Sequence, residues 1–259
     1  MKIKLQLGVI CAIILLVFQA QAARPSLTIQ TSAGPVKITP IYHASALIQA
    51  GSKSIYIDPA RPLPRPQPSA PSYFTGLPAA DLILITHTHP DHLDPVIIAK
   101  LSKPGTKIIA PAAVAKTVTA AKVISNGQTT TWDGWTIHAV AMYNLKRGPA
   151  PGKLYHPKDL GNGYVLTYGG KRIYFSGGTE NTPELRALKN IDVAFVCMNL
   201  PFTMPPAESA AAVRAFHPKI AIPYHYRSHY GTSNLNDFKN DLKGAGIKVR
   251  IFNWYSKQP

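Results

Sequence analysis

Three histidines and two aspartates occupy the eight residues 87–94, which read HTHPDHLD. Imidazole nitrogens and carboxylate oxygens suit zinc, iron or manganese, and a cluster without thiolates that keeps a position open for water is typical of catalytic metal sites. His87 and His89 can hold one ion, while Asp91 and His92 can reach a second. A pair of ions about 3.5–4 Å apart is a known arrangement for hydrolysis. The alternative is a histidine-rich surface turn that binds metal adventitiously.

The residues around this cluster indicate how it is positioned. Residues 81–86 form a short apolar, β-branched run, which is typical of a buried parallel strand. Asp94 followed by Pro95 predicts a helix N-cap with proline at the first helical position, so that a helix begins at residue 95. The cluster then lies on a strand-to-helix turn, where α/β sheets bind ligands. This placement favours a metal site over an adventitious surface turn.

The hydrophobic pattern predicts strands and helices in both halves of the chain. Further strands are expected over residues 36–41, 46–48, 54–57, 107–110, 135–142, 163–167, 172–175, 191–198, 220–224 and 248–252. Further helices are expected over residues 111–120, 205–216 and 235–242, with another that starts at residues 182–183. A chain of 259 residues can bury a substantial core, and this pattern indicates one α/β domain.

The string HTHPDH resembles the HxHxDH signature of the metallo-β-lactamase fold superfamily. Other segments, in the same order, are similar to a branch that includes the ascorbate-phosphate lactonases and the N-acylethanolamine phospholipase D enzymes. These segments are residues 43–45, 56–59, 163–166, 172–174 and 223–226, so the resemblance runs from about Val36 to the C-terminus. It implies a four-layer αββα sandwich that hydrolyses its substrate with metal-activated water.

The resemblance also implies roles for particular residues. Five side chains are expected to hold metal, and they are His87, His89, Asp91, His92 and His225. Asp91 is in addition expected to orient the attacking water and carry its proton. The ligand set implies zinc, as one or two ions, with manganese or iron as alternatives. His43 is expected beside the site as a support or a substrate contact, and Asp58 resembles a carboxylate that holds a metal ligand from behind.

Two positions depart from the family pattern. Gly178 stands where the family usually has an aspartate that bridges both metals, and Asn144 stands where many relatives have a third histidine. Both changes weaken a two-metal model, so one full site is predicted more firmly than two. Glu180 either reaches the ions instead or is a surface residue near the cap of the following helix. His156, in the loop of residues 143–163, either contacts substrate or replaces the missing third ligand.

The first 22 residues have the features of a secretory signal peptide. Lys2 and Lys4 precede an apolar run, and Ala20-Gln21-Ala22 fits a cleavage site, so the hydrolase domain is expected to span residues 23–259. The rival interpretation is a retained membrane anchor, for which the apolar run is short. Cleavage would leave Cys197 as the only cysteine. A periplasmic or secreted location without disulfides is therefore expected.

The chain is strongly basic, with 28 lysines and arginines against 12 acidic residues. These cations are scattered, so the pattern predicts no nucleic-acid partner. An anionic small-molecule or lipid substrate is expected, together with peripheral contact with an anionic membrane surface. A proline-rich stretch over residues 59–71 is expected either to form a rim of the active site or to be a stiff surface loop.

Two functions of different classes are consistent with these residues. The first is an exported metal-dependent hydrolase, which an intact Asp91 favours. The second is a metal-binding or ligand-binding protein that has lost most of its catalysis through the change at Gly178.

Overall fold

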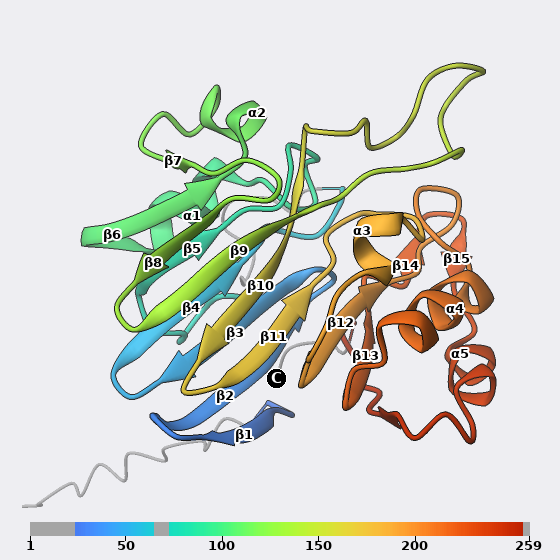
Figure 1. The fold of residues 1–259 in the computed structure, drawn as a ribbon. Helices are drawn as coiled ribbons and strands as arrows, with labels where there is room; N and C mark the ends of the chain where they lie inside the picture. The colour runs from blue at the N-terminus through green and yellow to red at the C-terminus, as the bar shows by residue number, and fades with distance from the viewer. Residues whose placement is uncertain (1–23, 65–72, 256–259) are drawn as a thin grey trace, which may run out of the picture.

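Two seven-stranded sheets carry most of the chain, and the computed structural model describes residues 24–64 and 73–255 (Figure 1). The first sheet has the order β1 (Leu27–Thr31), β2 (Gly34–Tyr42), β3 (Ser45–Ala50), β4 (Lys53–Ile57), β5 (Ala80–Leu84), β6 (Ser102–Ala110) and β7 (Lys122–Val123). The second has the order β16 (Lys248–Val249), β13 (Ile220–Tyr224), β12 (Val193–Cys197), β11 (Lys171–Phe175), β10 (Asn162–Tyr168), β9 (Trp135–Ala141) and β8 (Thr129–Trp132). A small hairpin of β14 (Arg227–Ser228) and β15 (Gly231–Thr232) stands apart from both.

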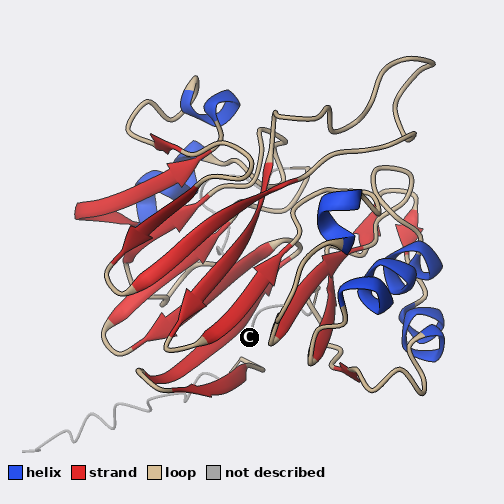
Figure 2. Cartoon of the chain, in the orientation of Figure 1, coloured by secondary structure: helices blue, strands red, loops and turns tan. Residues whose placement is uncertain are grey.

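Helices cover the outer face of each sheet (Figure 2). The first sheet is covered by α1 (Pro95–Leu101) and α2 (Ala112–Ala115), and the second by α3 (Pro183–Arg186), α4 (Pro206–Phe216) and α5 (Leu235–Asp241). Alternation along the strands builds these layers, since Ile55 and Ile57 join the cluster shared with the second sheet while Tyr56 packs with α1 and α2. The predicted αββα sandwich is confirmed.

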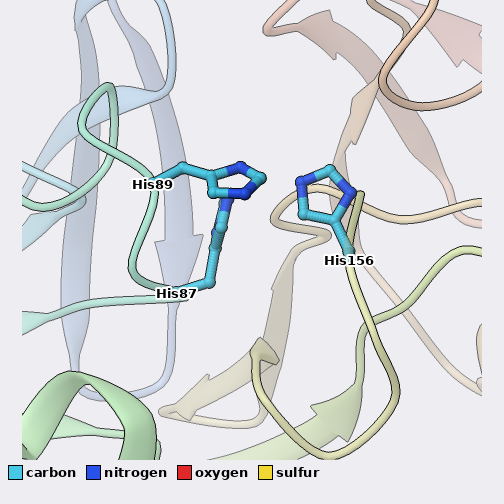
Figure 3. A group of neighbouring side chains, drawn as sticks. All are labelled: His87, His89 and His156. Carbon is cyan, nitrogen blue, oxygen red and sulfur yellow. The ribbon is translucent and has the colours of Figure 1, made fainter. Parts of the chain in front are cut away.

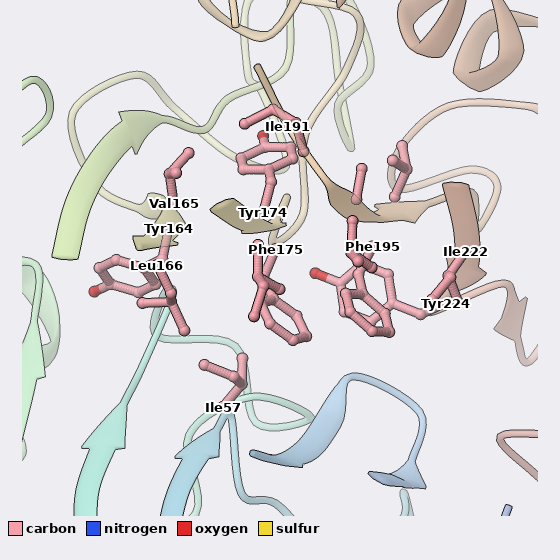
Figure 4. Packing of buried hydrophobic residues seen from close by; sticks show 14 of the residues in the cluster. Ile57, Tyr164, Val165, Leu166, Tyr174, Phe175, Ile191, Phe195, Ile222 and Tyr224 are labelled. Carbon is pink, nitrogen blue, oxygen red and sulfur yellow. The ribbon is translucent and has the colours of Figure 1, made fainter. Parts of the chain in front are cut away.

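The space between the sheets is filled by closely packed aromatic and aliphatic side chains (Figure 4). Phe175 and Phe195 stack with ring centroids 4.4 Å apart, and Tyr224 meets Phe195 edge-on at 6.1 Å. These rings belong to β11, β12 and β13, the parallel strands whose ends carry part of the site. Their packing fixes how those strand ends lie relative to one another.

Both sheets follow the same plan of strand directions. Starting from β1 in one sheet and β8 in the other, each has three antiparallel pairings and then three parallel ones. As a result, β2, β4 and β5 run in one direction in the first sheet, as do β9, β11 and β13 in the second. The loops after these six strands carry the predicted site residues. Their convergence at one edge is the arrangement in which α/β sheets bind ligands.

The sequence predicted most elements but not all of their lengths. The helix expected over residues 111–120 ends at Ala115 in the structure, because Thr117, Val118 and Thr119 are β-branched and disfavour helix. The last strand, expected over residues 248–252, spans Lys248–Val249 alone. The edge strands β1, β7 and β8 were not predicted. The predicted signal peptide and residues 65–71 of the proline-rich stretch lie outside the described residues.

Within residues 24–64 and 73–255, helices are too short or too polar to span a bilayer. The longest of them, α4, has 11 residues. Cys197 is buried as a free thiol.

Asp94 fixes the start of α1 and thereby the end of the metal-binding turn. Its carboxylate accepts the backbone N–H of Val96 at 3.1 Å, which makes it the predicted N-cap. The same carboxylate binds Arg61, with Nε–Oδ2 at 2.6 Å, and the Asp94 side chain is 1% exposed. This ion pair ties residues 59–64 to the turn.

We predict that Asp94→Ala lowers the free energy of unfolding by about 2 kcal/mol or more, because it removes a cap and leaves Arg61 without its buried partner. Asp94→Asn keeps a capping oxygen and should lose less. Denaturant titration measures both, with Asp241→Ala on the exposed face of α5 as the matched control. Equal stability of Asp94→Ala and the parent protein would contradict this role.

Candidate metal centre

Imidazoles from four separate loops meet at the shared edge of the two sheets. His87, His89 and His92 lie on the turn after β5, His43 follows β2, His156 lies in the loop between β9 and β10, and His225 follows β13. The predicted convergence of His225 with the turn is what the structure shows, since His225 Nε2 lies 2.7 Å from His92 Nε2. These side chains form two adjoining groups.

His87, His89 and His156 form the three-histidine group (Figure 3). One nitrogen from each ring lies within 4.8 Å of the other two, and the ring centroids are 4.7–4.9 Å apart. His87 Nδ1 is 2.9 Å from the Thr86 hydroxyl, whereas its buried Nε2 has no hydrogen-bond partner among the described residues. A buried nitrogen that has no hydrogen-bond partner and lies beside two other imidazoles is what a metal ligand requires.

Asn144 holds His156 in the required orientation. Its Oδ1 accepts the backbone N–H of His156 at 2.9 Å and also bonds the ring Nδ1. The ring Nε2 is therefore the atom left to face His87 and His89. Asn144 was predicted as a gap in the ligand set, and in the structure it orients His156 toward His87 and His89.

Gly178 leaves the space that His156 occupies. A Cβ atom at position 178 would lie 2.5 Å from His156 Nε2, far inside any tolerated contact. A side chain at 178 and the imidazole of His156 therefore exclude each other. Of the two roles predicted for His156, this placement favours that of the replacement ligand.

The prediction that Glu180 reaches the ions or lies on the surface is wrong on both counts. The side chain is fully buried, and it points into the loop that follows β9. Its oxygens accept Asn144 Nδ2 at 3.1 Å and the backbone N–H groups of Leu145, Lys146 and Arg147 at 2.9–3.1 Å. Burial opposes ionisation, but these bonds hold the pKa of Glu180 below its usual value. Glu180 anchors the loop that carries His156.

Asp91, His92 and His225, with His43 beside them, form the aspartate group. Asp91 Oδ2 lies 3.3 Å from His225 Nε2, 3.8 Å from His92 Nε2 and 3.0 Å from His43 Nε2. His43 Nδ1 in turn lies 2.8 Å from the Tyr255 hydroxyl. Asp91, His225 and either His92 or His43 can therefore hold a second ion, and His43 supports Asp91 if it is not a ligand itself.

Asp58 holds His92 and the start of the metal-binding turn from behind. Its Oδ2 is 2.6 Å from His92 Nδ1, and its Oδ1 accepts the backbone N–H of Thr86 at 2.7 Å. A carboxylate on Nδ1 orients the ring and leaves Nε2 free, as in many metal sites. His43, Asp58 and His225 also adopt left-handed backbone conformations, with φ of 56°, 43° and 48°. Such strain concentrates at functional sites.

Burial keeps most of these imidazoles neutral. It lowers the pKa of His87, His89 and His156, and neighbouring histidines lower it further. Burial, together with His43, lowers the pKa of His225 to about 3. For Asp91, burial acts against ionisation, but His92, His225 and His43 hold the pKa well below its usual value. Burial also opposes the charge on His92, yet Asp58 and Asp91 raise its pKa. Neutral imidazoles and an ionised carboxylate are the forms that bind metal.

A pocket of about 600 Å³ opens above both groups. His89, Asp91, His156 and His225 line it, as do residues 61–63, which supports the rim predicted for the proline-rich stretch. Sequence reasoning missed several other lining residues, which are Tyr42, Tyr155, Phe202, Arg227, His229 and Tyr255. Arg227 and His229 follow the Tyr224-His225-Tyr226 segment closely, and that proximity was the one signal available.

This sandwich and this site define a metal centre of the metallo-β-lactamase fold. The model of the β-lactamase superfamily domain matches residues 37–225, and the chain belongs to that family. A UPF0173 metal-dependent hydrolase of Aeropyrum pernix is 32% identical over 232 residues, which cover 83% of this chain and 93% of that protein. The chain is thus a metal-dependent hydrolase.

Solved structures agree with this assignment. A proposed metal-dependent hydrolase from Parabacteroides distasonis superposes with a TM-score of 0.78 at 40% identity, over 88% of this chain and 98% of the other. Igni18, a metallo hydrolase from Ignicoccus hospitalis, has a TM-score of 0.68 over 84% of this chain and 94% of the other. Its 22% identity supports the fold alone. The narrower likeness to lactonases and phospholipases stays a prediction.

We predict that Gly178→Ala weakens metal binding about tenfold or more, as His156→Ala does, because the added Cβ displaces the His156 ring. Equilibrium dialysis with zinc measures the affinity, with His138→Ala as the control, since His138 belongs to neither group and bonds Thr129 instead. Unchanged affinity in Gly178→Ala would show that His156 is not a ligand.

We also predict that bound metal is retained well below pH 6.5, the usual pKa of histidine. Because the pKa values of His87, His89 and His156 are lowered, protons compete with metal at lower pH than for free imidazole. Metal content after dialysis from about pH 7.5 to about pH 5 measures this retention. Half-release near the pKa of free imidazole would contradict it.

Proposed function

We propose that the protein is an exported zinc hydrolase that cleaves an ester, lactone, amide or phosphodiester in an anionic small molecule or lipid. The observation that carries the proposal is the meeting of two ligand groups at the floor of one pocket. Zinc is proposed because the donors are imidazoles and one carboxylate, with no thiolate. Manganese and iron remain alternatives, and the three-histidine group is the firmer of the two sites.

The side chains divide the work of the reaction. A bound divalent ion would polarise the bond to be cleaved and activate water as the nucleophile. Asp91 is ionised, lies at the pocket floor and can accept a proton from that water. His43 contacts the same Asp91 oxygen at 3.0 Å and keeps it in place. Asn144 and Asp58 keep His156 and His92 turned toward the centre.

Export is proposed from the signal-peptide features of the first 22 residues, which lie outside the described residues. The basic composition supports an anionic substrate and peripheral contact with an anionic membrane surface. Scattered lysines and arginines give no support to a nucleic-acid partner. The mature protein would work in the periplasm or outside the cell.

The rival candidate is a protein that binds metal or ligand with little catalysis. Gly178 favours it, since no carboxylate from that position joins the two groups. Asp91 and the pocket favour the enzyme, because turnover needs both, whereas the three-histidine group can hold an ion without Asp91.

The test is hydrolysis of 4-nitrophenyl acetate and bis(4-nitrophenyl) phosphate by zinc-loaded mature protein. His89→Ala and Asp91→Asn should each lower kcat/KM by about a hundredfold or more, whereas His138→Ala should not. Gly178→Asp should be impaired as well, because it displaces His156. If zinc binds but the parent protein cleaves neither substrate, the binding protein is the better account.

A further inference from the structure

Arg227 is the one strong cation that the described pocket leaves without an acidic partner. Arg61 also lines the pocket, but Asp94 binds it. The guanidinium of Arg227 lies over the Tyr255 ring, 5.1 Å from its centroid, and the described residues give it no ion pair. Asp91 is the only acidic residue that lines the pocket, and it belongs to the metal centre. The charge of Arg227 is thus available to a ligand.

Backbone hydrogen bonds hold Arg227 beside the metal centre. Its backbone N–H bonds the Tyr255 hydroxyl at 3.2 Å, and it pairs with Thr232 in the β14–β15 hairpin. That same hydroxyl contacts His43, which contacts Asp91. A tautomer of His43 that donates from Nε2 and accepts at Nδ1 satisfies this whole chain of bonds. The backbone of Arg227 is therefore fixed relative to the metal centre, and its exposed side chain lies over the Tyr255 ring.

We propose that Arg227 recognises an oxyanion of the substrate, carboxylate or phosphate, that is separate from the bond being cleaved. This inference rests on the proposed hydrolase function and narrows its substrate class. Arg227 lines the same pocket of about 600 Å³ as His89, Asp91 and His225, so a ligand in that pocket can meet Arg227 at one end and the metal centre at the other. Tyr155, Phe202 and Tyr255 give such a ligand aromatic surfaces within the pocket. A planar guanidinium suits either oxyanion through paired hydrogen bonds.

The test compares 4-nitrophenyl acetate with mono(4-nitrophenyl) glutarate, which carries a free carboxylate away from the ester. The parent should prefer the glutarate in kcat/KM, and Arg227→Gln should lower that preference by about tenfold or more. Arg227→Lys should retain part of it. Arg250→Gln, which changes an arginine outside the pocket, should keep the parent's preference. An unchanged preference in Arg227→Gln, or an equal loss on both esters, would overturn the assignment.

Binding provides a second readout that does not need turnover. Calorimetric titration of zinc-loaded protein with monomethyl glutarate and with methyl phosphate should show binding that weakens about tenfold in Arg227→Gln, and the tighter of the two identifies the oxyanion. Zinc content should be the same in both proteins. If no ester is cleaved but this loss of binding appears, the hydrolase function fails while Arg227 stands. If both proteins bind equally, Arg227 is not the recognition residue.

Discussion

The imidazoles of His87, His89, His92, His156 and His225 lie together with the Asp91 carboxylate at one edge of the sandwich, and the metal centre depends on keeping most of these rings neutral. Protonated rings at 4–5 Å would repel one another in a medium that screens charge poorly. Burial lowers the pKa of most of the rings and removes that repulsion. The buried Nε2 of His87 has no hydrogen-bond partner among the described residues, which is unfavourable by itself, and a divalent cation would relieve this cost.

Hydrogen bonds from the surrounding residues fix which nitrogen faces the centre in three of the rings. Asp58 takes one nitrogen of His92, Asn144 takes one of His156, and Thr86 takes one of His87. Asn144 is held in turn by Glu180, whose buried carboxylate accepts the Asn144 side-chain amide and backbone N–H groups of the same loop. The loop between β9 and β10 is thus fastened to the core although it is long. This anchoring explains how His156, which lies in a loop, can be positioned as precisely as residues at the end of a strand.

Local sequence signals predicted one part of the site and could not predict another. The turn of residues 87–94 can be predicted from the sequence, because its candidate ligands, the preceding strand and the helix cap lie within 15 residues of one another. The sequence left two roles open for His156, because the choice between them depends on empty space at Gly178, which is 22 residues further along the chain. The prediction for Glu180 was wrong because the sequence gives the length of its side chain but not the direction in which that side chain points. Arg227 is a candidate recognition residue because no acidic residue of the described pocket pairs with it. This can be seen only when the residues that line the pocket are known.

The most direct test of this account is the position of the ion itself. Crystals of zinc-loaded protein, measured at the zinc absorption edge, should show anomalous density about 2.0–2.1 Å from nitrogens of His87, His89 and His156. Density in that place would establish that His156 uses the space left at Gly178. Zinc bound by the turn with the His156 ring directed elsewhere, or no zinc at all, would contradict it.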